Sequence, residues 1–128
     1  MKTRILKPIF SRYFWAININ KLFMELDVNT GSIITQEEAK TLITAFKTKF
    51  PGEVTSSFIG ANNVKNILDQ NSCIGLRIYN GYDEVNEKIS LVLVGVDNDE
   101  KEILENGLIV DQMVTCPPRC SIDGLGVK

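Results

Sequence analysis

The apolar run at residues 89–96, Ile-Ser-Leu-Val-Leu-Val-Gly-Val, constrains the fold more than any other part of the chain. It is rich in β-branched residues and too short for a typical helix. It also lacks the polar alternation of a strand that has one wet face. We therefore predict a strand that is buried on both faces and lies centrally in a small antiparallel sheet.

The preceding run, residues 73–79, predicts the partner of that strand, because its apolar side chains alternate. One face carries Ile74, Leu76 and Ile78, and the other carries Cys73, Gly75, Arg77 and Tyr79. Asn80-Gly81 is a turn signal, so we predict a hairpin whose loop covers residues 80–88. A third strand is expected at 108–114, nearer an edge, after a helical turn at 101–105.

Two helices are expected before the hairpin. Thr35 and Glu38 have the spacing of a capping box, and Pro51-Gly52 provides a stop signal. A second, shorter helix is predicted at 61–70. The apolar stripe of the first helix consists of Ala39, Leu42, Ile43, Phe46 and Phe50.

Helices followed by strands indicate the α+β class: a small antiparallel sheet of about three strands, with a central hairpin, covered by two helices. We predict one domain at residues 24–121 and a loosely held C-terminal tail at 122–128. Residues 1–23 form a basic and aromatic N-terminal extension of uncertain structure.

From about Pro8, the apolar residues of this N-terminal extension recur at the spacing of an amphipathic helix. Such a helix suits a membrane surface or a protein partner, although membrane contact is the less favoured interpretation. The same residues suit packing on the domain's own core, an edge strand, or an upstream segment before a natural start at Met24. The rest of the chain has 9 basic and 16 acidic residues, which argues against nucleic-acid binding.

The counts of histidine and cysteine exclude several kinds of catalytic and metal-binding site. There is no histidine, so Ser-His-Asp, Cys-His and histidine-metal chemistry within the chain are excluded. Three cysteines is an odd number, which argues against a fully paired secreted framework and favours the cytoplasm. No cofactor is expected, and the acidic turn at 97–102 fails the calcium-loop template because Lys101 and Glu102 replace required residues.

Cys116 and Cys120 are the first candidate site, in the motif Cys-Pro-Pro-Arg-Cys. The favoured interpretation is a pair of structural thiols in a proline-rigid turn. A disulfide or redox switch, with Cys73 as a resolving thiol, is the next alternative. A metal site is the least favoured, since even with Cys73 nearby it needs a fourth ligand such as Asp123.

Arg77 and Tyr79 are the second candidate site, because they share a strand face and Gly75 leaves room beside them. A guanidinium next to an aromatic ring suits a small anionic or planar ligand. The structural alternative is that Arg77 pairs with an acid across the sheet while the Tyr79 hydroxyl stays at the surface.

Several short motifs together resemble a family of short uncharacterised bacterial proteins, over residues 24–121. The resemblance implies a bacterial, cytoplasmic, free-standing domain, and it supplies no catalytic residues. The motifs are Glu-Glu-Ala at 37–39, Gly-x-Arg-Ile-Tyr at 75–79, Leu-Val-Leu-Val-Gly-Val-Asp at 91–97, Asn-Gly at 106–107 and Cys-Pro-Pro-x-Cys at 116–120.

The favoured functional hypothesis is a non-catalytic interaction or accessory domain, which associates with a protein partner or with itself through a strand edge or an apolar helix face. The alternative is a thiol-based redox sensor or enzyme that uses Cys116 and Cys120. A binder of a small anionic ligand at Arg77 and Tyr79 is the third hypothesis.

Overall fold

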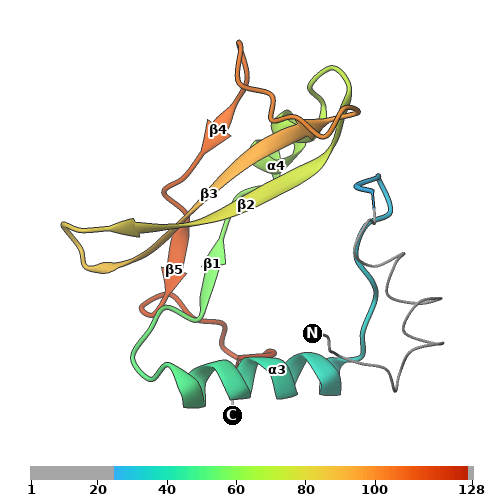
Figure 1. The fold of residues 1–128 in the computed structure, drawn as a ribbon. Coiled ribbons are helices and arrows are strands. Elements are labelled where there is room, and N and C mark those ends of the chain that lie inside the picture. The colour runs from blue at the N-terminus through green and yellow to red at the C-terminus, as the bar shows by residue number, and fades with distance from the viewer. Residues whose placement is uncertain (1–24, 127–128) are drawn as a thin grey trace, which may run out of the picture.

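The computed structural model describes residues 25–126, and the predicted N-terminal extension therefore lies outside the described residues. Within that range the predicted α+β class is confirmed, with two helices and small antiparallel sheets (Figure 1). The elements in chain order are α3 (Gln36–Lys49), β1 (Ser56–Phe58), α4 (Ala61–Leu68), β2 (Cys73–Asp83), β3 (Lys88–Asp97), β4 (Ile109–Val110) and β5 (Val114–Cys116).

The β2–β3 hairpin is longer than we expected. It pairs from Cys73 opposite Asp97 to Asp83 opposite Lys88. The predicted loop at 80–88 is therefore wrong, and the turn consists of residues 84–87. The Asp83 side chain explains this turn, because its Oδ1 accepts the Val85 and Asn86 N–H groups at 3.0 and 3.1 Å.

Strand β3 is central in the sheet order β2-β3-β4, and its buried character is confirmed. Leu93, Val94 and Val96 are each 3% exposed or less. Helix α4 packs on β2 and β3 and contributes the fully buried Ile67. Gly95 permits this approach, because a Cβ there would lie 2.8 Å from Gln70 Nε2.

The expected third strand is divided between two sheets. Strand β4 pairs with β3, whereas β5 pairs with β1 in a separate two-stranded sheet. Gln112 lies between them with φ 61°, a left-handed conformation that interrupts an extended run. The predicted helical turn at 101–105 is also wrong, since Glu102 forms a β-bridge with Val96 along the edge of β3.

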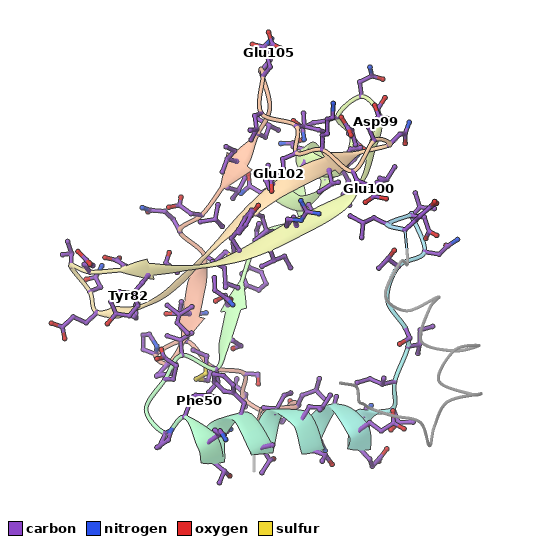
Figure 2. The ribbon with its side chains drawn as sticks, viewed as in Figure 1. Phe50, Tyr82, Asp99, Glu100, Glu102 and Glu105 are labelled. Atoms are coloured by element: carbon purple, nitrogen blue, oxygen red, sulfur yellow. A yellow bond between two sulfur atoms is a disulfide. The ribbon has the colours of Figure 1, made fainter. Side chains whose placement is uncertain are left out.

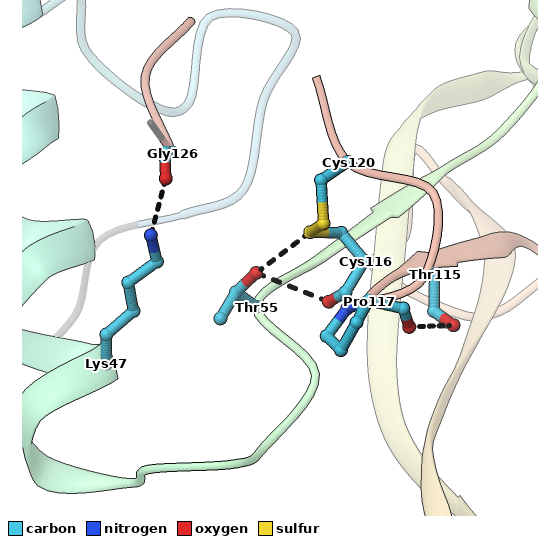
Figure 3. The surroundings of a disulfide bond; sticks show 7 residues. All are labelled: Lys47, Thr55, Thr115, Cys116, Pro117, Cys120 and Gly126. Atoms are coloured by element: carbon cyan, nitrogen blue, oxygen red, sulfur yellow. Dashed lines mark hydrogen bonds between the residues drawn. A yellow bond between two sulfur atoms is a disulfide. The ribbon is translucent and has the colours of Figure 1, made fainter. Parts of the chain in front are cut away.

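Helix α3 begins and ends as its sequence predicts. Thr35 Oγ1 accepts the Glu38 N–H at 3.1 Å, and the Phe50 N–H closes the helix on the Phe46 carbonyl at 2.8 Å. None of the helix residues is buried. The C-terminal segment, which we expected to be loosely held, lies along α3, and Lys47 Nζ donates to the carbonyl of Gly126 (Figures 1 and 3).

The described part of the chain has a small core and a large exposed apolar surface. Its buried hydrophobic side chains are Ile67, Leu93, Val94 and Val96, whereas 17 large hydrophobic side chains are exposed. Among residues 25–126, no helix has the length and apolar character required to cross a bilayer.

Candidate functional site

The structure brings Arg77 and Tyr79 together with a third residue, Glu102. Arg77 Nη1 lies 3.3 Å from Glu102 Oε2, and the Tyr79 hydroxyl donates to the same oxygen. Figure 2 shows Glu102 over the sheet, near Glu100 and Asp99. The Glu102 backbone bridges to Val96 on the side of β3 that faces away from β2. Its carboxylate reaches over β3 to Arg77 and Tyr79 on β2.

This contact moves the pKa values of Tyr79 and Glu102 further from neutrality. The hydrogen bond to the Glu102 carboxylate raises the pKa of Tyr79 above its ordinary value of 10.0. The same hydrogen bond, followed by that from Arg77, lowers the pKa of Glu102 below 4.5. At neutral pH the tyrosine is therefore neutral and the glutamate charged, and neither is poised for acid–base catalysis.

An anionic ligand at Arg77 and Tyr79 would compete with the Glu102 carboxylate. The structural alternative from the sequence, an acid paired with Arg77, is the arrangement observed. Sequence reasoning did not identify Glu102 as this acid, because it placed Glu102 in a helical turn. The only available signal was the excess of acids after β3, and that excess does not specify which acid turns back over the sheet.

The Cys116 and Cys120 pair forms a disulfide, with the two Cα atoms 4.8 Å apart (Figure 3). Pairing of β1 with β5 positions Thr55 beside this bond, because the Thr55 N–H donates to the Cys116 carbonyl at 2.8 Å. The Thr55 hydroxyl lies 3.5 Å from Cys116 Sγ. Cys116 is half-buried and Cys120 is exposed, so Cys120 is the sulfur open to an external thiol.

The structure does not bring Cys73 to this pair. Cys73 is a free thiol near Gly95, and its S–H donates to the Gly75 carbonyl at 3.3 Å. The disulfide lies toward the other end of the hairpin, where Lys88 Nζ donates to Thr115 Oγ1 at 3.2 Å. The length of β2, about 33 Å at roughly 3.3 Å per residue, separates the two ends.

A metal site with these thiols has no support in the described range. No group of three or more His, Cys, Asp or Glu side chains within residues 25–126 is arranged to hold a metal ion. Asp97, in the rejected calcium turn, instead accepts the backbone N–H groups of Asp99 and Lys101 at 2.9 and 3.0 Å.

Several hollows lie among the described residues, and two of them adjoin β2; sequence reasoning missed both, because each is formed by segments far apart in the chain. The larger, of about 520 Å³, lies between the two sheets and has a mixed lining that includes Lys88, Asp83 and Asp111. The smaller, of about 380 Å³, lies beside β2 at Gly75, where Leu26 and Val28 form its other wall.

The β2 strand also presents an edge. Among residues 25–126, β2 pairs with β3 alone, so its other side is an open sheet edge. Three large side chains of this strand are more than 45% exposed: Ile78 at 56%, Tyr79 at 47% and Tyr82 at 60%. Figure 2 shows Tyr82 toward the turn end of the hairpin.

Comparison of the chain with protein-family models, with curated proteins and with solved structures found no match in any of the three. The resemblance to short bacterial proteins stays a prediction.

Proposed function

We propose that this chain is a non-catalytic interaction domain of a bacterial cell, and that it assembles with another protein chain in the cytoplasm. The apolar stripe of α3 carries the proposal. Its Leu42 and Phe50 side chains are 65% and 50% exposed, although the helix is well capped and its stripe is continuous. A stable helix whose apolar stripe is only partly covered within residues 25–126 is typical of a surface that a partner covers.

The energetics favour a partner over solvent. Full burial of a leucine or phenylalanine side chain stabilises by about 1.5–3 kcal/mol. Leu42, Ile43, Phe46 and Phe50 lie on one side of α3, and the Phe46 and Phe50 ring centroids are 5.1 Å apart. Aromatic residues grouped in this way are enriched at the centres of protein interfaces.

A photocrosslinking amino acid at position 42, introduced in cells of the source organism, tests this proposal. We expect a discrete adduct with one protein chain at position 42. Thr44 is the matched control, because it lies two residues away on the opposite side of the same helix and is exposed. Equal labelling at both positions, or no adduct at position 42, would overturn the proposal.

A thiol-based redox sensor at Cys116 and Cys120 is the second candidate function. The accessible Cys120 sulfur and the Thr55 hydroxyl beside Cys116 Sγ support it. A glutathione thiolate that attacks Cys120 Sγ forms a mixed disulfide and releases Cys116 as a thiolate, which the Thr55 hydroxyl stabilises. A second glutathione then releases Cys120, so two glutathiones become glutathione disulfide and two cysteine thiols form.

Mass spectrometry of thiol-alkylated protein in glutathione buffers measures this equilibrium. We expect the pair to change from oxidised to reduced between about −180 and −320 mV, the range that cellular compartments span. Cys73→Ser is the control and is expected to leave the midpoint unchanged, because Cys73 lies at the other end of the hairpin. A pair that stays oxidised throughout that range is structural, and the sensor hypothesis then fails.

A further inference from the structure

We propose that the open edge of β2 binds a second copy of this chain, whose own β2 adds antiparallel so that Arg77 of each copy lies opposite Asp83 of the other. The proposal rests on the proposed interaction function and names one of its partners. The two three-stranded sheets would then form one continuous sheet across a two-fold axis at Asn80.

The edge itself suits strand addition. Strand β2 has 11 residues, and strands of this length are seldom left open. Sheet edges are commonly protected by proline, lysine or bulges; β2 contains neither residue, and its one register shift lies at its start, between Cys73 and Gly75. Within residues 25–126, the outer side of this strand has no paired strand.

The residues of β2 are self-complementary about Asn80. A two-fold axis pairs residues that lie at equal distances from it. The charged residues of the strand are Arg77 and Asp83, each three positions from Asn80. Of the three exposed large side chains, Ile78 and Tyr82 are each two positions from it, and Tyr79 lies opposite Gly81. One register therefore forms two opposite-charge pairs and two apolar pairs, which are the contacts that stabilise antiparallel strands.

The contact between Arg77 and Glu102 is compatible with this register. Glu102 contacts Nη1 of the guanidinium, and a guanidinium has five N–H donors. Asp83 accepts hydrogen bonds from its own turn, yet a carboxylate offers about four acceptor positions. Each group therefore retains capacity for its counterpart in the second copy.

A second feature supports the same register independently of the charges. Val85, at the tip of the hairpin, is 90% exposed. The axis at Asn80 places Val85 of one copy opposite Gly75 of the other. Gly75 borders the hollow of about 380 Å³, whose walls include Leu26, Val28 and Ile74. The exposed tip of each copy thus lies beside a recess on its partner that has both apolar and polar walls.

Cysteine crosslinking tests the register directly. Asn80→Cys in a Cys73→Ser background places two identical cysteines opposite each other, at a distance that a disulfide spans. We expect mild oxidation to convert most of the protein to a covalent dimer. Val85→Cys is the matched control, because in this register its two copies lie about 33 Å apart and do not crosslink. Equal crosslinking at both positions would overturn the register.

Exchange of the two charges provides a second test, in which each charge variant alone is compared with a mixture of the two. Arg77→Asp and Asp83→Arg each place like charges opposite each other, so each variant alone is expected to dimerise at least about tenfold more weakly. An equimolar mixture restores both opposite-charge pairs and is expected to form a one-to-one heterodimer in sedimentation velocity. A mixture of folded variants that does not associate would overturn the proposal.

The outcomes separate this inference from the proposed function. Association without crosslinking at position 80 shows that another surface or another protein strand is used, and the inference fails while the interaction function stands. If the chain is monomeric but still forms an adduct at position 42, the inference likewise fails while the interaction function stands. If either charge variant fails to fold, the crosslinking pair at positions 80 and 85 decides the result.

Discussion

At the residue scale, Glu102 connects the two side chains that first suggested a binding site. Its carboxylate accepts from Tyr79 and pairs with Arg77, so one acid satisfies both groups of the β2 face. The exposed surroundings limit what the pair contributes to stability, because water screens it. Its main effect is to orient Arg77, which the proposed dimer uses.

Glu102→Gln is expected to lower the pKa of Tyr79 toward 10.0, because a neutral amide accepts the hydroxyl proton less strongly than a carboxylate. Ultraviolet titration of tyrosinate measures the change, with Tyr79→Phe variants subtracted to isolate this residue. An unchanged pKa for Tyr79 would show that the hydrogen bond to Glu102 is not formed in solution.

The pH dependence of stability follows from the two shifts. The lowered pKa of Glu102 contributes stability that is present above 4.5 and is lost as pH falls through the lowered value. The raised pKa of Tyr79 contributes stability that is present below 10.0 and is lost as pH rises through the raised value. Denaturant unfolding of wild type and Glu102→Gln should therefore differ most between these limits and converge outside them.

Gly95→Ala is expected to destabilise the fold by roughly 1–3 kcal/mol through overpacking. The added Cβ would lie 2.8 Å from Gln70 Nε2 and 3.1 Å from Cys73 Sγ, between β3 and α4. Gly75→Ala is the matched control, because nothing lies within 4 Å of its Cβ position. Chemical denaturation measures both, and similar losses for the two variants would contradict the close packing at Gly95.

At the element scale, the two helices have different roles. Helix α4 is short, yet it contributes Ile67 to the core and packs on β2 and β3. Helix α3 is longer and has no buried residue, so its stability depends on its own caps and on the C-terminal segment beside it. This difference makes α4 part of the scaffold and α3 a surface.

Thr35→Ala is expected to destabilise α3 by about 1 kcal/mol, because the Glu38 N–H loses its acceptor. Hydrogen exchange should accelerate at the first amides of α3 and stay unchanged in β3. Thr41→Ala is the control, since Thr41 lies inside the helix, where alanine is the better helix former. Equal acceleration in β3 would show that α3 and the sheet unfold as one unit.

At the scale of the whole molecule, few side chains maintain the fold. Ile67→Ala is expected to cost about 2–5 kcal/mol, a large part of the roughly 5–15 kcal/mol that stabilises a typical domain. Ile67 is 0% exposed, whereas the neighbouring Leu68 is 42% exposed. Leu68→Ala is therefore the control, with an expected loss under about 1 kcal/mol. Thermal and denaturant unfolding compare them, and equal losses would contradict a core centred on Ile67.

The sequence predicted what local chemistry controls. Thr35 and the stop at Pro51-Gly52 defined α3, and the β-branched run defined the buried part of β3. The turn was misplaced because Asn80-Gly81 is a stronger local signal than the Asp83 carboxylate that forms it. Glu102 and the β1–β5 pair depend on the path of the chain between distant segments, and no local spacing specifies that path.

The β1–β5 sheet also has a consequence for synthesis. Thr55 pairs with Cys116, which is 61 residues later in the chain. At about 5–20 residues per second, a ribosome needs roughly 3–12 s to make that interval. The α4 and β2–β3 unit becomes complete in sequence within this interval, whereas β1 has no partner until its end. Because β5 is made after the whole β2–β3 hairpin, the second sheet can close only once the first hairpin is complete in sequence.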